Sequence, residues 1–214
     1  MKSPVNNSWA CRRILLMKSA RLLVILMVVT CGFSSSQDVV QYFPPRAFSD
    51  NPTLDTGVRR WYSKCLNALD EPSLWTASKD SERQHYRFLW LRTWDHPISV
   101  RVDRNDDETA TLTLKVTSGS GGYEPGKLDI VRTKKLSKEE FDAIADRFTA
   151  SGFWTMASIV PSSGRDGAQW VLEAAKSGRY SFVDRWSPRD GAIRDLALHL
   201  LQLSEYKVAG DKVY

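Results

Sequence analysis

The chain has 214 residues, of which 26% are charged, and a formal net charge of +5. All of the excess positive charge lies in residues 1–36, which hold five of the 30 Lys and Arg residues and no acidic residue. The rest of the chain carries 25 basic and 25 acidic residues and is formally neutral. A neutral domain lacks the basic surface that nucleic-acid binding needs, so nucleic acid is excluded from the expected partners.

Residues 1–36 have the pattern of a bacterial export signal. Lys18 and Arg21 precede a 12-residue apolar stretch, Leu22 to Phe33, and serines follow at 34–36. This stretch is too short to cross a bilayer, which takes about 20 helical residues. We therefore expect a signal that is cleaved on export and a mature protein that is periplasmic or secreted. Met17 is a more ordinary start for such a signal than Met1.

Two alternatives keep the protein at the membrane. The apolar residues 14–16 lengthen the stretch towards an uncleaved N-terminal anchor, although Lys18 and Arg21 interrupt it. Cys31 offers a site for lipid attachment, although the preceding Val-Val-Thr lacks the small residue that is usual before an acylated cysteine. Contact with a membrane is expected only through the signal or through a lipid on Cys31.

The cysteines indicate a domain that is held together by packing. Cys11 and Cys31 fall in the leader, so the mature chain keeps Cys65 alone and can form no internal disulfide. The remaining length suits a single domain with its own apolar core. We expect an extended, proline-containing lead-in at 37–53 and the domain at 54–214.

Three helices are predicted. Apolar residues recur at i, i+3, i+4 and i+7 from about Thr56 to Leu69, and Cys65 lies on this stripe, where a buried and inert thiol is expected. The Ser-Lys-Glu-Glu run at 137–140 is a capping box that opens a second helix. Ser187, followed by a proline, is predicted to cap the last helix.

The strands follow from period-two alternation, and they are predicted at 85–91, 98–103, 110–116, 128–133, 169–174 and 179–186. The element order is then α-ββββ-α-ββ-α. Hairpins dominate and no regular strand–helix–strand alternation is present. We therefore predict an α+β domain with a mostly antiparallel sheet of about six strands and three helices, packed on one face of the sheet.

Two segments resemble ligand motifs and fail on their chemistry. The run from Gly121 to Lys127 has the spacing of a phosphate-binding loop, but Leu128 replaces the hydroxyl residue and a strand follows where a helix is needed. The segment that begins at Asp103 resembles a calcium loop, but it has Glu108 in place of the required glycine and Leu114 in place of the bidentate glutamate. No cofactor and no metal are expected.

His96 is the one candidate for catalysis. It lies in a Trp-Asp-His-Pro turn, and in an alternative interpretation it serves as the base of an envelope hydrolase, with Glu124 or Asp166 brought in from separate loops. No nucleophile motif, paired cysteines or HExxH sequence accompanies it. A turn histidine that bonds to the backbone is therefore favoured.

The aromatic content offers candidates for binding. Seven tryptophans follow the leader, and exposed tryptophans are typical of surfaces that bind glycans or peptides. The ligand-binding candidates are Trp94, His96, Tyr123, Arg185 and Trp186. Burial at the edges of the core is the alternative explanation for the tryptophans among them.

Four segments carry a resemblance to a known group of proteins: 86–102, 121–128, 166–173 and 185–188. In combination they are similar to a family of small exported bacterial proteins of unknown function, over about residues 55–205. The resemblance implies a single periplasmic or surface-associated domain and carries no substrate and no catalytic residue.

Three functions are therefore considered. The favoured one is a non-catalytic exported domain that binds an unidentified ligand or protein of the cell envelope. The alternatives are the hydrolase built around His96 and a chaperone-like or inhibitor module that uses an exposed sheet edge.

Overall fold

The structure is a computed structural model of the chain, and it describes residues 41–80, 82–162, 164 and 166–214. The predicted signal at 1–36, with Met17 and Cys31, lies outside these residues, as does the start of the lead-in. Within the part of the chain that is described, no helix combines the length and the apolar content that a membrane crossing requires.

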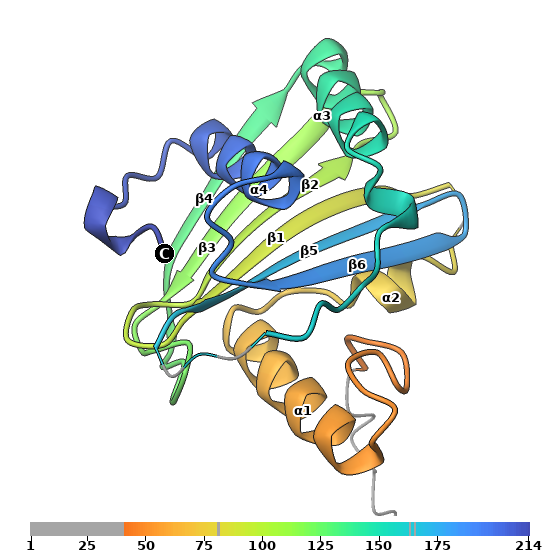
Figure 1. Cartoon of the computed structure of the whole chain (residues 1–214). Helices are drawn as coiled ribbons and strands as arrows, with labels where there is room; N and C mark the ends of the chain where they lie inside the picture. Colours follow the sequence, from red (N-terminus) through yellow and green to blue (C-terminus); the bar gives the residue numbers. More distant parts are fainter. Residues whose placement is uncertain (1–40, 81, 163, 165) are drawn as a thin grey trace, which may run out of the picture. The chain divides into compact units, whose positions relative to one another are not determined.

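A single six-stranded antiparallel sheet forms the centre of the described unit (Figure 1). The strand order is β4-β3-β2-β1-β5-β6. The first four strands form a meander, and β5 then pairs with the free side of β1 while β6 turns back along β5. The α+β class and the order of the three predicted helices and six predicted strands are confirmed, and the short helix α2 (Leu74–Ala77) is an addition to them. The strands are β1 (Gln84–Arg92), β2 (Ile98–Arg104), β3 (Ala110–Thr117), β4 (Leu128–Leu136), β5 (Ala168–Lys176) and β6 (Arg179–Trp186).

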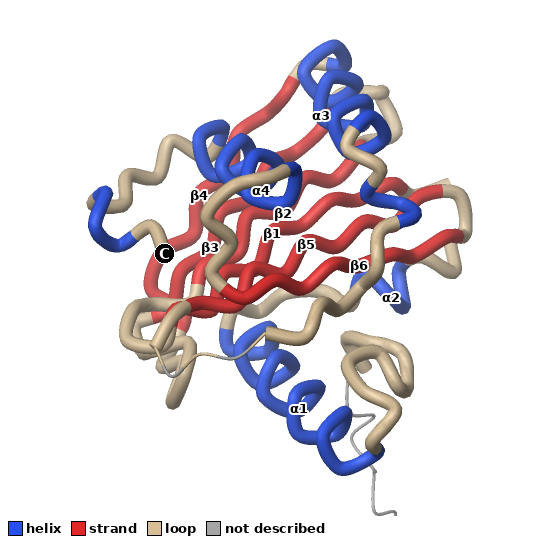
Figure 2. The backbone as a smooth tube through the Cα atoms, viewed as in Figure 1, coloured by secondary structure: helices blue, strands red, loops and turns tan. Residues whose placement is uncertain are grey.

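The helices cover both faces of the sheet, so the prediction that they pack on one face is wrong (Figure 2). The helices are α1 (Pro52–Ala68), the short α2 (Leu74–Ala77), α3 (Lys138–Ala150) and α4 (Ala192–Leu203). Helices α3 and α4 lie against one face, and α1 and α2 against the other. The physical reason is that the central strands are apolar on both sides, for example at Leu89 and Val171, and both sides must be shielded from water.

The core under α3 and α4 is rich in aromatic rings. Phe88, Trp90 and Trp170 are fully buried, and the rings of the two tryptophans lie 5.0 Å apart between centroids. Their indole N–H groups both donate to the main-chain oxygen of Tyr214, at 3.2 and 2.9 Å. The C-terminal segment is thereby fastened to the middle of the sheet, and two buried donors are satisfied.

The core under α1 includes the lead-in. Cys65 is fully buried there, as the helical stripe predicted, and Tyr42 and Phe43 from the lead-in are buried beside it. Residues 41–51 form no helix or strand, yet the carboxylate of Asp55 accepts hydrogen bonds from the main-chain N–H groups of Arg46 and Phe48. From residue 41 on, the lead-in is therefore part of the folded domain.

Two helix starts differ from prediction. Helix α1 begins four residues earlier than Thr56, because the side chain of Asn51 caps it and Pro52 takes the first helical position. Ser187 does not cap α4, which begins at Ala192. The hydroxyl of Ser187 instead accepts a hydrogen bond from the main-chain N–H of Ala168, at 2.8 Å, and so ties the start of β5 to the end of β6. The capping box of α3 forms as predicted.

The two edge strands of the sheet, β6 and β4, differ in how they are covered. The edge of β6 is covered by residues 157–160, where the N–H of Asp184 donates to the carbonyl of Ser158 at 2.8 Å. Among the described residues, no strand pairs with the outer edge of β4. That edge carries the exposed side chains of Arg132, Lys134 and Lys135. Charges of this kind oppose edge-to-edge pairing with another sheet.

Candidate functional site

The five predicted ligand-binding residues gather at one end of the sheet. Trp94 and His96 lie in the loop from β1 to β2, and Tyr123 lies in the loop from β3 to β4. Arg185 and Trp186 close β6, whose last residues lie beside the start of β5. The meander brings these segments together because alternate connections of antiparallel strands meet at the same end (Figure 1).

Trp94 and Tyr123 form an exposed aromatic pair. Their ring centroids lie 5.0 Å apart with planes inclined by 37°. Trp94 is 59% exposed and Tyr123 is 55% exposed, which is unusual for large rings in a domain with two well-filled cores. The indole N–H of Trp94 donates to a carboxylate oxygen of Asp166 at 3.2 Å. The pair is therefore both open to solvent and held in place.

A glycine-rich loop positions Tyr123. The N–H of Gly121 donates to the carbonyl of Asp95 at 3.0 Å, and the indole N–H of Trp61 donates to the carbonyl of Gly121 at 2.6 Å. A Cβ atom on Gly121 would lie 2.7 Å from the carbonyl oxygen of Arg92. The glycines that resembled a phosphate loop thus allow one strand connection to pack directly on another.

Two grooves lie at this end of the sheet, one lined by the ring of Trp94 and the other by the ring of Tyr123. The first, the Trp94 groove, has a volume of about 660 Å³ and is lined by Trp94, Asp166, Arg189, Arg194, Lys212 and Tyr214 among others. The second, the Tyr123 groove, has a volume of about 470 Å³ and includes Trp61, Tyr123 and Trp186 in its lining. Both volumes fall in the range of small-ligand sites, roughly 300–1,000 Å³.

His96 does not meet the carboxylates that a hydrolase would need. Its Nδ1 lies 2.8 Å from the carbonyl oxygen of Gly119, and since a carbonyl can only accept, Nδ1 carries the proton. Asp166 holds the indole of Trp94, and Glu124 forms an ion pair with Lys64. Among the described residues, no carboxylate is hydrogen-bonded to His96. The histidine serves the loop backbone.

Arg185 and Trp186 also have structural partners. The guanidinium of Arg185 donates to the carbonyls of Ser158 and Ala157, at 3.1 and 2.8 Å, and so fastens the segment that covers the β6 edge. The half-buried indole of Trp186 lies so close to Gly164 that a Cβ atom there would be 2.2 Å from its Nε1. Trp186 still lines the Tyr123 groove, whereas Arg185 is engaged with the backbone.

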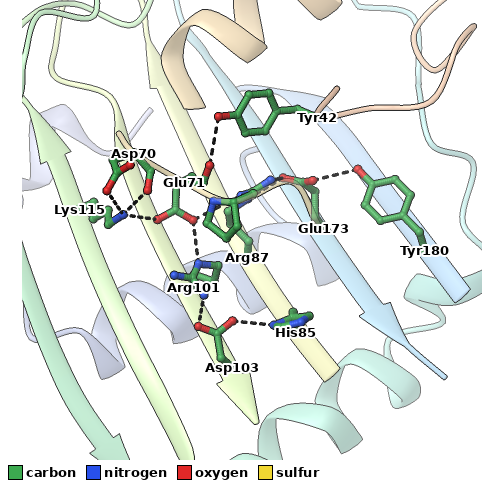
Figure 3. Close-up of polar contacts among 11 residues, drawn as sticks. Tyr42, Asp70, Glu71, His85, Arg87, Arg101, Asp103, Lys115, Glu173 and Tyr180 are labelled. Atoms are coloured by element: carbon green, nitrogen blue, oxygen red, sulfur yellow. Dashed lines mark hydrogen bonds and ion pairs between the residues drawn. The ribbon is translucent and has the colours of Figure 1, made fainter. Parts of the chain in front are cut away.

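A network of buried charges lies on the α1 face of the sheet, and sequence reasoning missed it (Figure 3). Arg87 of β1 contacts Glu173 of β5 at 2.6 Å and Glu71, between α1 and α2, at 3.3 Å. Arg101 of β2 lies 2.9 Å from the same Glu71, and Lys115 of β3 lies 3.7 Å from it. The partners lie on other strands and in the α1–α2 junction, so alternation within one strand gives no sign that these charges meet in the interior.

The network ends in a histidine–carboxylate pair. Nδ1 of His85 lies 2.7 Å from Asp103, whose carboxylate also pairs with Arg101. Burial lowers the pKa of His85 to about 4, and the positive charge of Arg101 acts in the same direction. The neutral imidazole therefore donates from Nδ1, and its buried Nε2 has no partner among the described residues.

The buried network holds the fold and forms no open site. Burial works to lower the pKa of Arg87, but the carboxylates of Glu173 and Glu71 outweigh it and raise that pKa. Because Glu71 lies between α1 and α2, the network fixes that junction on three neighbouring strands. The aromatic end of the sheet therefore remains the candidate site.

Metals and known relatives do not assign a function to this site. Within the residues that the structure describes, no group of three or more His, Cys, Asp or Glu side chains is arranged to hold a metal ion. No protein-family model matches the chain, and no curated protein matches it significantly.

Proposed function

We propose that the protein is an exported, non-catalytic domain that binds an oligosaccharide of the cell envelope on the aromatic pair of Trp94 and Tyr123. The observation that carries the proposal is that two large rings, each more than half exposed, are held beside each other at the mouths of two grooves. Exposed apolar surface of this kind marks an interaction site when it is not needed for packing.

The surroundings of the pair favour a sugar. A sugar ring has an apolar C–H face that packs on an aromatic ring and hydroxyls that bond to planar polar groups around it. Asp166 provides such a planar group, because its carboxylate is held against the indole of Trp94. A rigid aromatic ring loses little conformational entropy on binding, which suits a weakly apolar ligand.

The non-catalytic character is supported by the state of the titratable groups. His96, Glu124 and Asp166 are each bonded to a different neighbour. Export is supported by the leader pattern in residues 1–36.

Binding is tested by calorimetry with oligosaccharides of envelope type, beginning with a tetramer of β-1,4-linked N-acetylglucosamine. Trp94→Ala and Tyr123→Ala should each weaken binding by about fivefold, since a stacked ring contributes about 1 kcal/mol. Trp75→Phe, on α2, is the matched control and should leave the affinity unchanged. Unchanged affinity in both site variants, or no binding by the wild type across envelope saccharides, would overturn the proposal.

Export is tested by the mass of the native protein after cell fractionation. A mature chain that begins beyond residue 36, in the periplasmic or secreted fraction, is the expected result. A diacylglycerol adduct on Cys31 would replace the soluble form by a lipid-anchored one. Retention of Met1 or Met17 in the cytosolic fraction would contradict export.

A further inference from the structure

We infer that the Trp94 groove binds the carboxylate of an acidic sugar, with Arg194 and Arg189 as the recognition residues. This inference rests on the proposed function and adds the chemical class of the ligand. It arises from two guanidinium groups in the lining of the groove that form no ion pair with the described residues.

Three cations (Arg189, Arg194 and Lys212) and two carboxylates (Asp166 and Asp211) line the groove, and Lys212 and Asp166 are each engaged by a neighbour. Lys212 lies 3.4 Å from Asp95, and Asp166 accepts the indole N–H of Trp94. Arg189 and Arg194 have no carboxylate within ion-pair distance among the described residues, although both line the groove. The groove therefore offers two guanidinium groups to an anion that comes from outside.

Arg194 is held ready for such an anion. One of its terminal nitrogens donates to the carbonyl of Pro188 at 2.9 Å, and its guanidinium lies over the ring of Trp170 at 5.2 Å from the centroid. A guanidinium group has five N–H donors, so further donors remain for a ligand. Its planar fork matches the two oxygens of a carboxylate, and a group fixed in this way loses little freedom when it binds.

Arg189 differs from Arg194 in its freedom to move. Arg189 is exposed and stands outside any described ion pair, so it can follow the ligand.

The Trp94 groove places the guanidinium of Arg194 and the ring of Trp94 in the wall of the same site. Trp94 belongs both to the aromatic pair and to the wall of the groove. A sugar that packs on Trp94 would thus direct a substituent towards Arg194. A ring that bears a carboxylate satisfies both parts of the site, whereas a neutral sugar leaves the guanidinium groups to water.

The test compares two trisaccharides that differ only at C6: β-1,4-linked glucuronate and β-1,4-linked glucose. Calorimetry at 0.15 M salt should give at least tenfold tighter binding of the acidic trisaccharide. Arg194→Gln and Arg189→Gln should each reduce that preference severalfold and leave the neutral trisaccharide unaffected. Arg194→Lys should restore only part of it, because an ammonium group cannot form the two-point contact.

Arg60→Gln is the matched control, because it removes one exposed positive charge from the outer face of α1. It should leave both affinities unchanged.

Equal affinity for the two trisaccharides, with no effect of Arg194→Gln, would overturn the acidic-sugar inference. A loss of affinity in Trp94→Ala would in that case still support the proposed function. Equal losses in Arg60→Gln and Arg194→Gln would reduce the preference to general charge attraction and would also overturn the inference. Absence of binding to either sugar, with Trp94→Ala like the wild type, would overturn both proposals. Since Arg189 is exposed, its variant keeps the test valid even if Arg194→Gln does not fold.

Discussion

Arg87 and Glu173 lie directly opposite each other on β1 and β5, and their side chains are completely buried. Nη2 and Nε of the arginine lie 2.6 and 2.7 Å from the same carboxylate oxygen, while the hydroxyl of Tyr180 donates to the other at 2.9 Å. Burial raises the pKa of Glu173, and Arg87 opposes this by holding the ionised form. The pair links the middle strands of the sheet to the α1–α2 junction through Glu71.

Removal of one residue of the Arg87–Glu173 pair should lower the free energy of unfolding far more than replacement of both by apolar residues. Arg87→Met leaves two buried carboxylates, those of Glu71 and Glu173, without their shared cation. The expected loss is about 3–5 kcal/mol in the free energy of unfolding, measured by urea titration. The double variant Arg87→Met/Glu173→Leu should recover part of this loss. A single variant within about 1 kcal/mol of the wild type would show that the network is not needed for stability.

Asp184 should make the protein more stable in mild acid. Burial raises the pKa of its carboxyl to about 6, against an ordinary value of 3.8. Between pH 4 and 6 the folded state therefore holds a proton that the unfolded state has released. By linkage, this group adds stability as the pH falls from about 6 to about 4, in total about 3 kcal/mol.

His85 should act in the opposite direction over the same range. Its pKa is lowered from 6.5 to about 4, so between these values the unfolded state binds a proton that the folded state excludes. Its contribution falls as the pH decreases from about 6.5 to about 4. The two effects offset each other in the wild type.

Single variants should reveal the two effects. Urea unfolding from pH 4.5 to 7.5, with the wild type subtracted, isolates each group. Asp184→Asn should lose stability relative to the wild type as the pH falls, and His85→Gln should gain it. The hydroxyl of Tyr62, which donates to Asp184 at 2.7 Å, can donate equally to an asparagine. Parallel pH profiles for all three proteins would contradict both assignments.

Gly121→Ala should disturb the aromatic end of the sheet. The added Cβ would lie 2.7 Å from the carbonyl oxygen of Arg92, so the loop must move, at a cost of about 1–3 kcal/mol. The near-ultraviolet circular dichroism of the tryptophans should change with it. Gly57→Ala is the matched control, because Gly57 lies in α1 with no atom within 4 Å of the added Cβ. That variant should gain about 0.5–1 kcal/mol, since alanine favours the helix. A neutral effect of Gly121→Ala would mean that the loop tolerates a shift.

Cys65 should be unreactive in the folded protein. It is fully buried, and burial raises the pKa of its thiol to about 12. In a variant with Cys11→Ser and Cys31→Ser, labelling by a thiol reagent should follow global unfolding and stay negligible in native buffer. Fast labelling of the native protein would indicate local opening of α1.

The local elements were predictable because they depend on neighbours in the sequence. Period-two alternation located the six strands, and the Ser137–Glu140 capping box located α3. The start of α4 was not predictable in this way, because Ser187 has a hydrogen-bonding partner on β5 that is distant in the sequence. A serine hydroxyl can cap a helix or bond to another segment, and here the tertiary contact with Ala168 takes the place of the helix cap.

The sequence by itself determined the element order, the single buried thiol and the candidates Trp94 and Tyr123, since each follows from residue type and spacing. Only the tertiary structure decided which of the candidates lie together, that Arg185 serves the backbone, and that Arg87 and Glu173 are buried as an ion pair. The physical reason is that α1 packs on a face whose polar residues pair with one another across strands. A charge is buried or solvated according to its partners, and those partners come from remote parts of the chain.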